Sequence, residues 1–256
     1  MESKPETTGI AASALHGWGM LFAALGIIGR GILQTRLLGL GETSAQALLE
    51  AMQSSDRTMA IATVSLVLQA METCAIPFFA LLLVEGFRHT SDFRRYLLRV
   101  LGAAVFSEIP YNLAISGKLL DLSSRNPIFG VALALIMLYF YGRFPGRSGK
   151  NLAVKAVVTV AALLWPVMLG ISFGSALVLT AAVMWLFREK PLLRNIGGTC
   201  AVIVCALSSP FYLAAPMGVL GAHFYNGEKG EENRLVNYLA YPALLLFAGL
   251  AGNLLL

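Results

Sequence analysis

The feature that most constrains this chain is an uncharged stretch that runs from residue 156 to residue 187. A helix that crosses a membrane needs about 20 mainly apolar residues, so this stretch is too long for one such helix. Trp165-Pro166 and Gly170 provide a break within it, because proline and glycine interrupt helices. The stretch therefore predicts two consecutive membrane-spanning helices joined by a short turn.

The remaining sequence is similarly apolar. Apolar residues make up 57% of the 256 residues and charged residues 13%, whereas soluble domains carry about 25% charge. This excludes a disordered chain, a coiled coil and an ordinary soluble enzyme. We predict an all-α, polytopic transmembrane bundle of about eight spans that forms one membrane-embedded domain over residues 1–256. The expected spans are residues 10–33, 58–85, 97–116, 127–142, two within 156–187, 195–222 and 235–255.

The net charge of +5 comes from Lys and Arg in the short gaps between these spans. Such residues favour the cytoplasmic side, and no basic-aromatic stripe indicates a nucleic-acid partner. With eight spans, both termini lie in the cytoplasm, on the side that holds more Lys and Arg. The start of the chain is polar and acidic, so we expect no cleaved signal and a location in the cytoplasmic (inner) membrane. Residues 34–57 form either a polar loop or an interfacial helix, because Ala47, Leu48, Ala51 and Met52 fall at helical spacing.

The sequence lacks the common catalytic motifs of soluble enzymes. It has no GxSxG, HExxH or P-loop motif, and its three cysteines, Cys74, Cys200 and Cys205, lie within apolar runs. We therefore predict neither a disulfide nor a bound metal, and no tightly bound cofactor.

Several polar residues fall inside the expected spans, where a charged side chain is costly and needs a partner. Glu72 lies near the middle of the second span. Glu108 and Asn112 share one face of the third span, with Tyr111 beside them. These side chains, with Glu85 at the end of the second span and with Asn126 and Asn226, are expected to line a polar cavity.

Each of these residues also has a structural interpretation. Glu72 could pair with Arg30 and fix helix packing. Glu108 could cap the kink at Pro110 or bond to a neighbouring backbone, and His89 could lie at the lipid headgroups. His16 and His223 have no partner that the sequence identifies, and we interpret them as incidental.

Residues 76–142 contain four ordered motifs, which are EGF at 85–87, His89-Thr90, YLLR at 96–99 and SEIP at 107–110. With these motifs the segment resembles the TraX family of integral membrane proteins. Weaker matches are Asn126 ahead of an aromatic-rich helix, the YNGEKG segment at 225–230, which includes Asn226, and Tyr241-Pro242.

This resemblance implies an activity related to membrane acyltransferases. The family's namesake is implicated in acetylating the N-terminus of conjugative pilin, and related enzymes use cytoplasmic acyl-CoA. Acetyl-CoA or another acyl-CoA is then the expected co-substrate, with a protein or envelope acceptor as partner. For an active enzyme we expect His89 and Glu108 as the catalytic residues, with Arg88, Arg94 and Arg95 at the donor phosphates.

The sequence also departs from the family pattern. The family's first helix ends in an Ile-Asp-His-Ile-Gly-like signature, which here reads LGIIG at 25–29. A Gly-Arg pair is replaced by Glu72-Thr73, and the His of Tyr-Pro-x-His is Leu244. Three hypotheses follow: an active acyltransferase that uses His89 or Glu108, an inactive family member that serves as a subunit of a membrane complex, or a small transporter built around Glu72 and Glu108.

Overall fold

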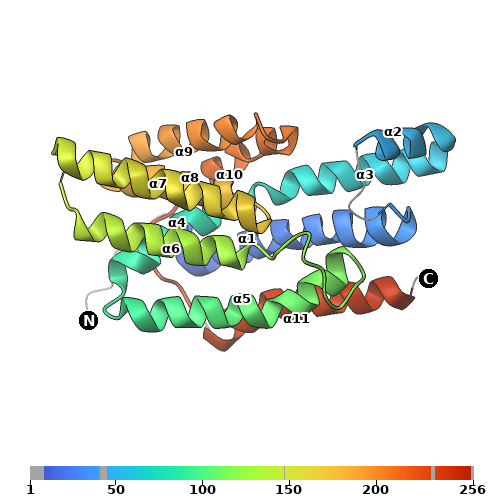
Figure 1. Ribbon diagram of the computed structural model, residues 1–256, viewed down its shortest axis with the longest axis horizontal. Coiled ribbons are helices and arrows are strands. Elements are labelled where there is room, and N and C mark those ends of the chain that lie inside the picture. The colour runs from blue at the N-terminus through green and yellow to red at the C-terminus, as the bar shows by residue number, and fades with distance from the viewer. Residues whose placement is uncertain (1–8, 41–44, 147, 232–233, 255–256) are drawn as a thin grey trace.

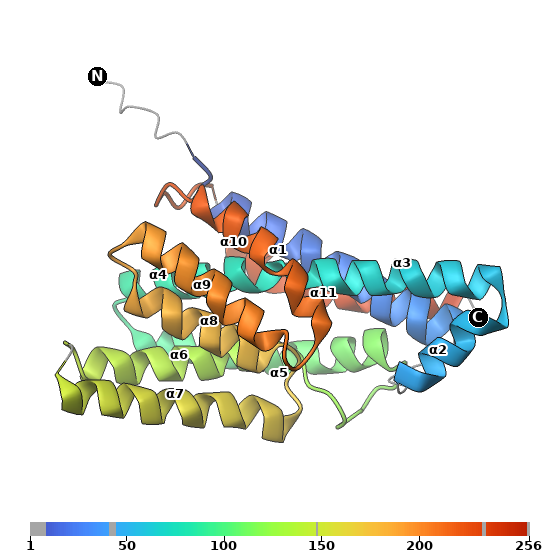
Figure 2. The ribbon, with the colours of Figure 1, turned by 90° about the horizontal axis from the view of Figure 1, so that it is seen from above.

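The computed structural model describes residues 9–40, 45–146, 148–231 and 234–254, which form an elongated helical bundle without a strand among them (Figures 1 and 2). The helices are α1 (Ala12–Ile27), the π-helix η1 (Ile28–Leu37), α2 (Ala45–Ser54), α3 (Asp56–Glu72), α4 (Ala75–His89), α5 (Phe93–Ile115), α6 (Ile128–Arg143), α7 (Gly149–Leu169), α8 (Gly174–Leu186), α9 (Pro191–Cys205), the 3-10 helix η2 (Pro210–Ala214), α10 (Pro216–His223) and α11 (Arg234–Leu254).

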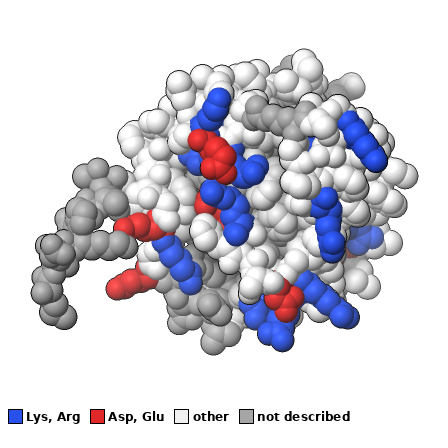
Figure 3. All heavy atoms as spheres, turned by 90° about the vertical axis from the view of Figure 1, so that its left-hand side faces the viewer, with Lys and Arg blue, Asp and Glu red and all other residues white. Residues whose placement is uncertain are grey.

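The helices run back and forth along the long axis, and basic residues gather at one end. At the left-hand side of Figure 1, α4 ends, α5 begins, α6 ends and α7 begins. Figure 3 looks onto this end and shows its Lys and Arg side chains. We call it the basic end, and the opposite end the distal end. The Lys and Arg residues at these helix ends and in the α8–α9 link are Arg88, Arg94, Arg95, Arg143, Lys150, Arg188 and Lys190.

Three helices are long and apolar enough to cross a membrane by length and composition. They are Ala12–Leu37, Asp56–His89 and Gly149–Leu169, and shorter apolar helices lie within α6, α8, α9 and α11. Large apolar side chains point outward, with Val105, Val157 and Val167 between 66% and 72% exposed. A surface of this kind suits lipid rather than water. The predicted all-α architecture is thus confirmed for the described residues, with three candidate membrane spans, and the number of eight spans stays a prediction.

The break within residues 156–187 is confirmed at Gly170, whereas α7 continues through Trp165-Pro166. α7 ends at Leu169, and Gly170 takes a left-handed conformation with φ of +64°. Its carbonyl accepts the backbone N–H of Arg125 at 2.8 Å, which ties the turn to the α5–α6 loop. α8 then returns from Gly174 toward the basic end.

Residues 195–222 differ from the prediction of one span, because they fold back on themselves. α9 ends at Cys205, and the chain turns through η2 into the antiparallel α10, as Figure 2 shows. Val202 of α9 packs with Val219 of α10 in one small cluster. Pro210 and Pro216 begin η2 and α10, where their missing N–H groups end the preceding hydrogen-bond pattern. The chain therefore makes a hairpin here instead of one continuous crossing.

This hairpin changes the direction of the last helix. α11 starts at the basic end and runs parallel to α5, so Gly249 packs against Leu113 and Gly252 against Arg36 at the distal end. Ile10, by contrast, pairs with Tyr225 at the basic end. The described chain thus begins and ends at opposite ends of the bundle, whereas the prediction placed both termini on one side.

The core lies where α4, α6 and α8 meet. α8 packs against both α4 and α6, and buried side chains of the three helices belong to one hydrophobic cluster. Members of this cluster with at most 1% exposure include Leu81, Val84, Leu135, Leu138, Val178 and Met184.

The segment 34–57 contains the helix that its spacing predicts. α2 covers Ala45–Ser54 and packs beside α3 near the distal end (Figure 2). Residues 41–44 lie outside the described residues. The location of α2 at a membrane surface stays a prediction.

Candidate functional site

The C-terminal end of α4 holds a cluster of charged side chains that includes the predicted catalytic His89. The His89 side chain is 75% exposed, and its Nδ1 lies 2.9 Å from the carbonyl oxygen of Glu85. Arg88 forms an ion pair with Glu85 at 3.1 Å and a longer one with Glu189 at 3.8 Å. These ion pairs connect the end of α4 to the α8–α9 link. His89 therefore lies on the surface beside a charged network that joins these two segments.

The predicted donor-binding residues Arg94 and Arg95 lie on the exposed first turn of α5. Asp92 is the N-cap of this helix and accepts the backbone N–H of Arg95 at 3.0 Å. The Arg95 guanidinium also pairs with the Asp92 carboxylate at 3.0 Å. Arg95 is thus partly neutralised by the capping residue, while Arg94 contributes to the basic end.

Glu108 and Asn126 are brought together in the interior. The Asn126 amide nitrogen donates to Glu108 Oε2 at 2.6 Å and to the Ala104 carbonyl at 2.9 Å, and Asn126 is fully buried. Its amide oxygen accepts the Ile128 backbone N–H at 3.0 Å, at the start of α6. Arg125 lies 3.6 Å from the other Glu108 oxygen. Glu108 therefore fastens the α5–α6 loop to α5.

Tyr111 stands at the centre of a group of hydroxyls. Its oxygen lies 3.0 Å from Ser124 Oγ and 2.7 Å from Ser172 Oγ, and the two serines are 3.1 Å apart. This group joins α5 to the turn between α7 and α8. Asn112, one residue further, is buried, and its side-chain oxygen has no hydrogen-bond partner among the described residues.

Asn226 belongs to a loop that caps α1. Its backbone N–H donates to Ile10 O at 3.1 Å, and its side-chain oxygen accepts the Glu228 N–H at 2.9 Å. The carbonyls of Glu228 and Lys229 accept the N–H groups of Ala12 and Ser13, which lie at the start of α1. These N–H groups have no partner within a helix, so the loop satisfies them. The YNGEKG segment therefore has a structural function here.

Glu72 and Arg30 form the ion pair that the sequence allowed as one interpretation. Arg30 Nη2 lies 3.7 Å from Glu72 Oε2, and both side chains are mostly buried. Gly26 packs so closely on Glu72 that a Cβ there would overlap the carboxyl group.

A cavity of about 410 Å³ lies between α1, α4, α5, α6, α8 and α11, and Glu72 lines it. Most of its wall is apolar, with Met20, Phe79, Val131 and Leu177 among its residues. We call it the inter-helix cavity. The polar or titratable side chains that line it are His16, Glu72, Tyr96, Arg99, Asn237, Tyr238 and Tyr241.

The cavity contains residues that the sequence analysis did not select. His16 was interpreted as incidental, yet it lines the cavity with its ring 5.9 Å from that of Phe79. Arg99 and Tyr241 lie in motifs that match the family, so these motifs could have identified both residues from the sequence. Of the predicted cavity residues, Glu72 lines this space, whereas Tyr111, Asn112 and Asn126 lie deeper between the helices.

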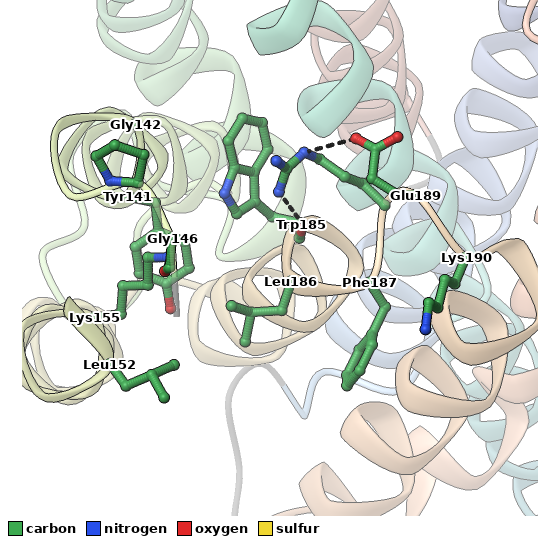
Figure 4. A pocket seen from close by; sticks show the side chains of 12 residues that line it. Tyr141, Gly142, Gly146, Leu152, Lys155, Trp185, Leu186, Phe187, Glu189 and Lys190 are labelled. Atoms are coloured by element: carbon green, nitrogen blue, oxygen red, sulfur yellow. Dashed lines mark hydrogen bonds and ion pairs between the residues drawn. The ribbon is translucent and has the colours of Figure 1, made fainter. Parts of the chain in front are cut away.

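A second pocket, of about 670 Å³, opens at the basic end between the α6–α7 region and the α8–α9 link. Figure 4 shows Lys155 on one side of this end pocket and Lys190 on the other, with Leu186 and Phe187 between them. The Arg188 guanidinium lies 4.3 Å from the Trp185 ring and pairs with Glu189 at 3.2 Å.

Two positions at which the family pattern has histidine meet in one apolar cluster. Ile27 is 2% exposed and packs with Tyr111 and Leu245. Leu244, at the second of these positions, packs against the same cluster. The histidines of the pattern would lie close together, and here both are replaced by aliphatic side chains.

Comparison with known proteins supports the resemblance. A family model described as TraX protein matches residues 48–251, which is most of the chain, and α1 lies outside the match. Neither a search of curated proteins nor a search of solved structures finds a match.

Proposed function

Because the chain belongs to the TraX family, we propose that this membrane protein transfers an acyl group from acyl-CoA to an amine or hydroxyl acceptor within the inter-helix cavity. The observation that carries the proposal is the cavity itself. It combines a mainly apolar wall with a histidine, an arginine and a buried acid, Glu72. Ligand sites typically have this composition, in which apolar walls hold the substrate and a few polar groups orient it.

The charge distribution supports one orientation in the bilayer. Basic residues concentrate at the basic end, and such residues remain on the cytoplasmic side. We place this end in the cytoplasm, with the protein crossing the inner membrane several times. The start of α1 then faces the cytoplasm, and the end of α11 faces the other side. Acyl-CoA would approach the basic end, where Arg88, Arg94 and Arg95 remain the proposed contacts for its phosphates.

His16 is the residue that we assign to proton transfer. The chain has three histidines, and among them only His16 lines the cavity. A neutral imidazole nitrogen would accept the proton of the acceptor N–H or O–H as the acceptor attacks the thioester carbonyl. The carbon–sulfur bond then breaks, and the imidazolium returns the proton to the departing thiolate. A positioned base of this kind contributes about 10²–10⁴-fold to the rate.

The three histidines provide a matched experiment. Membranes that contain the wild-type protein are incubated with radiolabelled acetyl-CoA, and label on protein or envelope acceptors is counted for His16→Ala, His89→Ala and His223→Ala. The proposal expects His16→Ala to lose at least a hundredfold, with the other two close to wild type. Loss only in His89→Ala would move the chemistry to the surface of the basic end and refute the assignment to the cavity.

A second candidate function is supported by Ile27 and Leu244. The two histidines of the family pattern are replaced together, and the replacements share one apolar cluster. A chain that exchanged a polar centre for packing would serve as a non-catalytic subunit of a membrane complex. Absence of label transfer by the wild type, together with a stoichiometric partner that co-purifies, would favour this function. Acyl transfer by the wild type with several turnovers per protein molecule would exclude the non-catalytic function.

A further inference from the structure

The end pocket combines apolar and cationic side chains in a way that the proposed acyl transfer does not use. Its walls come from the end of α6, the first turns of α7 and the α8–α9 link. Leu186 and Phe187 lie between the amines of Lys155 and Lys190 (Figure 4). The pocket is therefore apolar at its centre and cationic at both sides.

The charges in this pocket leave an excess of positive charge. Lys155, Arg188 and Lys190 contribute three cations, against Glu189 as the acid in the lining. Glu189 pairs with Arg188 at 3.2 Å, so it offsets the guanidinium rather than either amine. Lys155 Nζ donates to the Gly146 carbonyl at 2.9 Å, which holds this amine at the pocket wall. Two amines in the lining of one pocket create a positive potential inside it, which suits an anionic group.

The surface next to the pocket favours a ligand with long apolar chains. Leu152 in the lining is 45% exposed, and Val157 one turn further along α7 is 70% exposed. On α9, Leu192 and Ile196 are 68% and 52% exposed. These side chains continue from the basic end along the part of the bundle that faces lipid. A soluble phosphate compound would use the amines but leave this apolar surface unused.

We infer that the end pocket binds the headgroup of an anionic phospholipid. Its anionic headgroup lies in the pocket, where Lys155 and Lys190 provide positive charge at the two sides, and its acyl chains follow α7 and α9 into the bilayer. Basic pockets between helices on the cytoplasmic side bind anionic headgroups by this combination of charge and apolar contact. The inference is independent of acyl transfer in the inter-helix cavity.

The test measures lipid binding to the purified full-length protein by native mass spectrometry. Delipidated protein in detergent is titrated with phosphatidylglycerol or with phosphatidylcholine of the same chains. We expect tighter binding of phosphatidylglycerol. Lys155→Gln and Lys190→Gln should each weaken it about fivefold, which corresponds to about 1 kcal/mol, and the double variant about 25-fold.

The control is the double variant Arg143→Gln/Lys150→Gln, which removes the same charge from the basic end outside the pocket lining. It should change binding less than twofold. Circular dichroism and gel filtration check folding. Lys190 is exposed, so Lys190→Gln keeps the fold and tests lipid binding even if a Lys155 variant does not fold.

Three results would overturn the inference. Equal affinity for the two lipids would mean that charge does not select the ligand. An equal loss in the control variant would mean diffuse attraction by the whole basic end. Full displacement of the lipid by inorganic phosphate or by CoA at equal concentration would identify a soluble phosphate compound as the ligand.

Discussion

Substitution of Asn126 by alanine tests how the α5–α6 loop is held in the bundle. The side chain is fully buried and takes part in three hydrogen bonds, at 2.6 Å to Glu108 Oε2, at 2.9 Å to Ala104 O and at 3.0 Å from the Ile128 N–H. Neutral hydrogen bonds contribute about 1 kcal/mol each, and one to a charged group about 1.5–3 kcal/mol. Glu108 keeps its contact with Arg125 at 3.6 Å, which reduces the penalty for its carboxylate. We expect Asn126→Ala to lower the free energy of unfolding by about 3–4 kcal/mol.

The assay is reversible unfolding of the purified protein in mixed micelles, followed by circular dichroism as the denaturing detergent is increased. Asn151→Ala is the matched control. Asn151 lies in the first turn of α7, and its side-chain amide donates an exposed hydrogen bond to the Pro145 carbonyl. Loss of an exposed hydrogen bond of this kind should cost about 1 kcal/mol or less. A value below 1 kcal/mol for Asn126→Ala, or equal values for both variants, would refute the proposed function of Asn126 in holding the loop.

Three glycines give further predictions, each checked by the same unfolding assay. Gly26→Ala should cost about 1–3 kcal/mol, because a Cβ overlaps the Glu72 carboxyl group, although alanine in a helix normally gains about 1 kcal/mol. A stabilised variant would contradict the close packing of α1 on Glu72. Gly230→Ala should cost more than Gly227→Ala: both positions have positive φ, but a Cβ at Gly230 also overlaps Ser13, whereas Gly227 has open space. Equal costs would mean that the loop does not pack on the start of α1.

Local sequence features predicted the parts of the fold that depend on neighbouring residues. The break within residues 156–187 follows from Gly170, whose φ of +64° is easily adopted only by glycine. The pairing of Arg30 with Glu72 follows from the cost of leaving either charge alone among apolar helices. The structural interpretation of Glu108, as an acceptor for neighbouring backbone, is confirmed by its contact with the Asn126 N–H at 3.3 Å.

Features that depend on distant packing were not predictable. The apolar segment 195–222 has the length of one span, and only its packing of Val202 on Val219 reveals the hairpin. The direction of α11, and with it the position of the last described residues, depends on this hairpin. Hydropathy alone reports length and composition, which are the same for one span and for two short antiparallel helices.

The site is the part that sequence reasoning defined least well. Motif residues such as His89 and Asn226 have identifiable local contacts, and neither lines the inter-helix cavity. His16 belongs to no matched motif, and it reaches the cavity because α1 packs beside α4. A cavity lined by residues of seven helices depends on the arrangement of segments that are far apart in the sequence, which no single motif encodes.

Photolabelling shows directly whether the inter-helix cavity holds the acyl group of a substrate. The experiment uses a fatty acyl-CoA with a diazirine at the end of its chain, irradiated in membranes, and the labelled residues are mapped by mass spectrometry. We expect labels on cavity residues such as Met20, Phe79 and Leu177, and their loss in Val131→Trp, which fills the cavity. Labels confined to lipid-facing residues such as Val105, and unchanged in that variant, would contradict it.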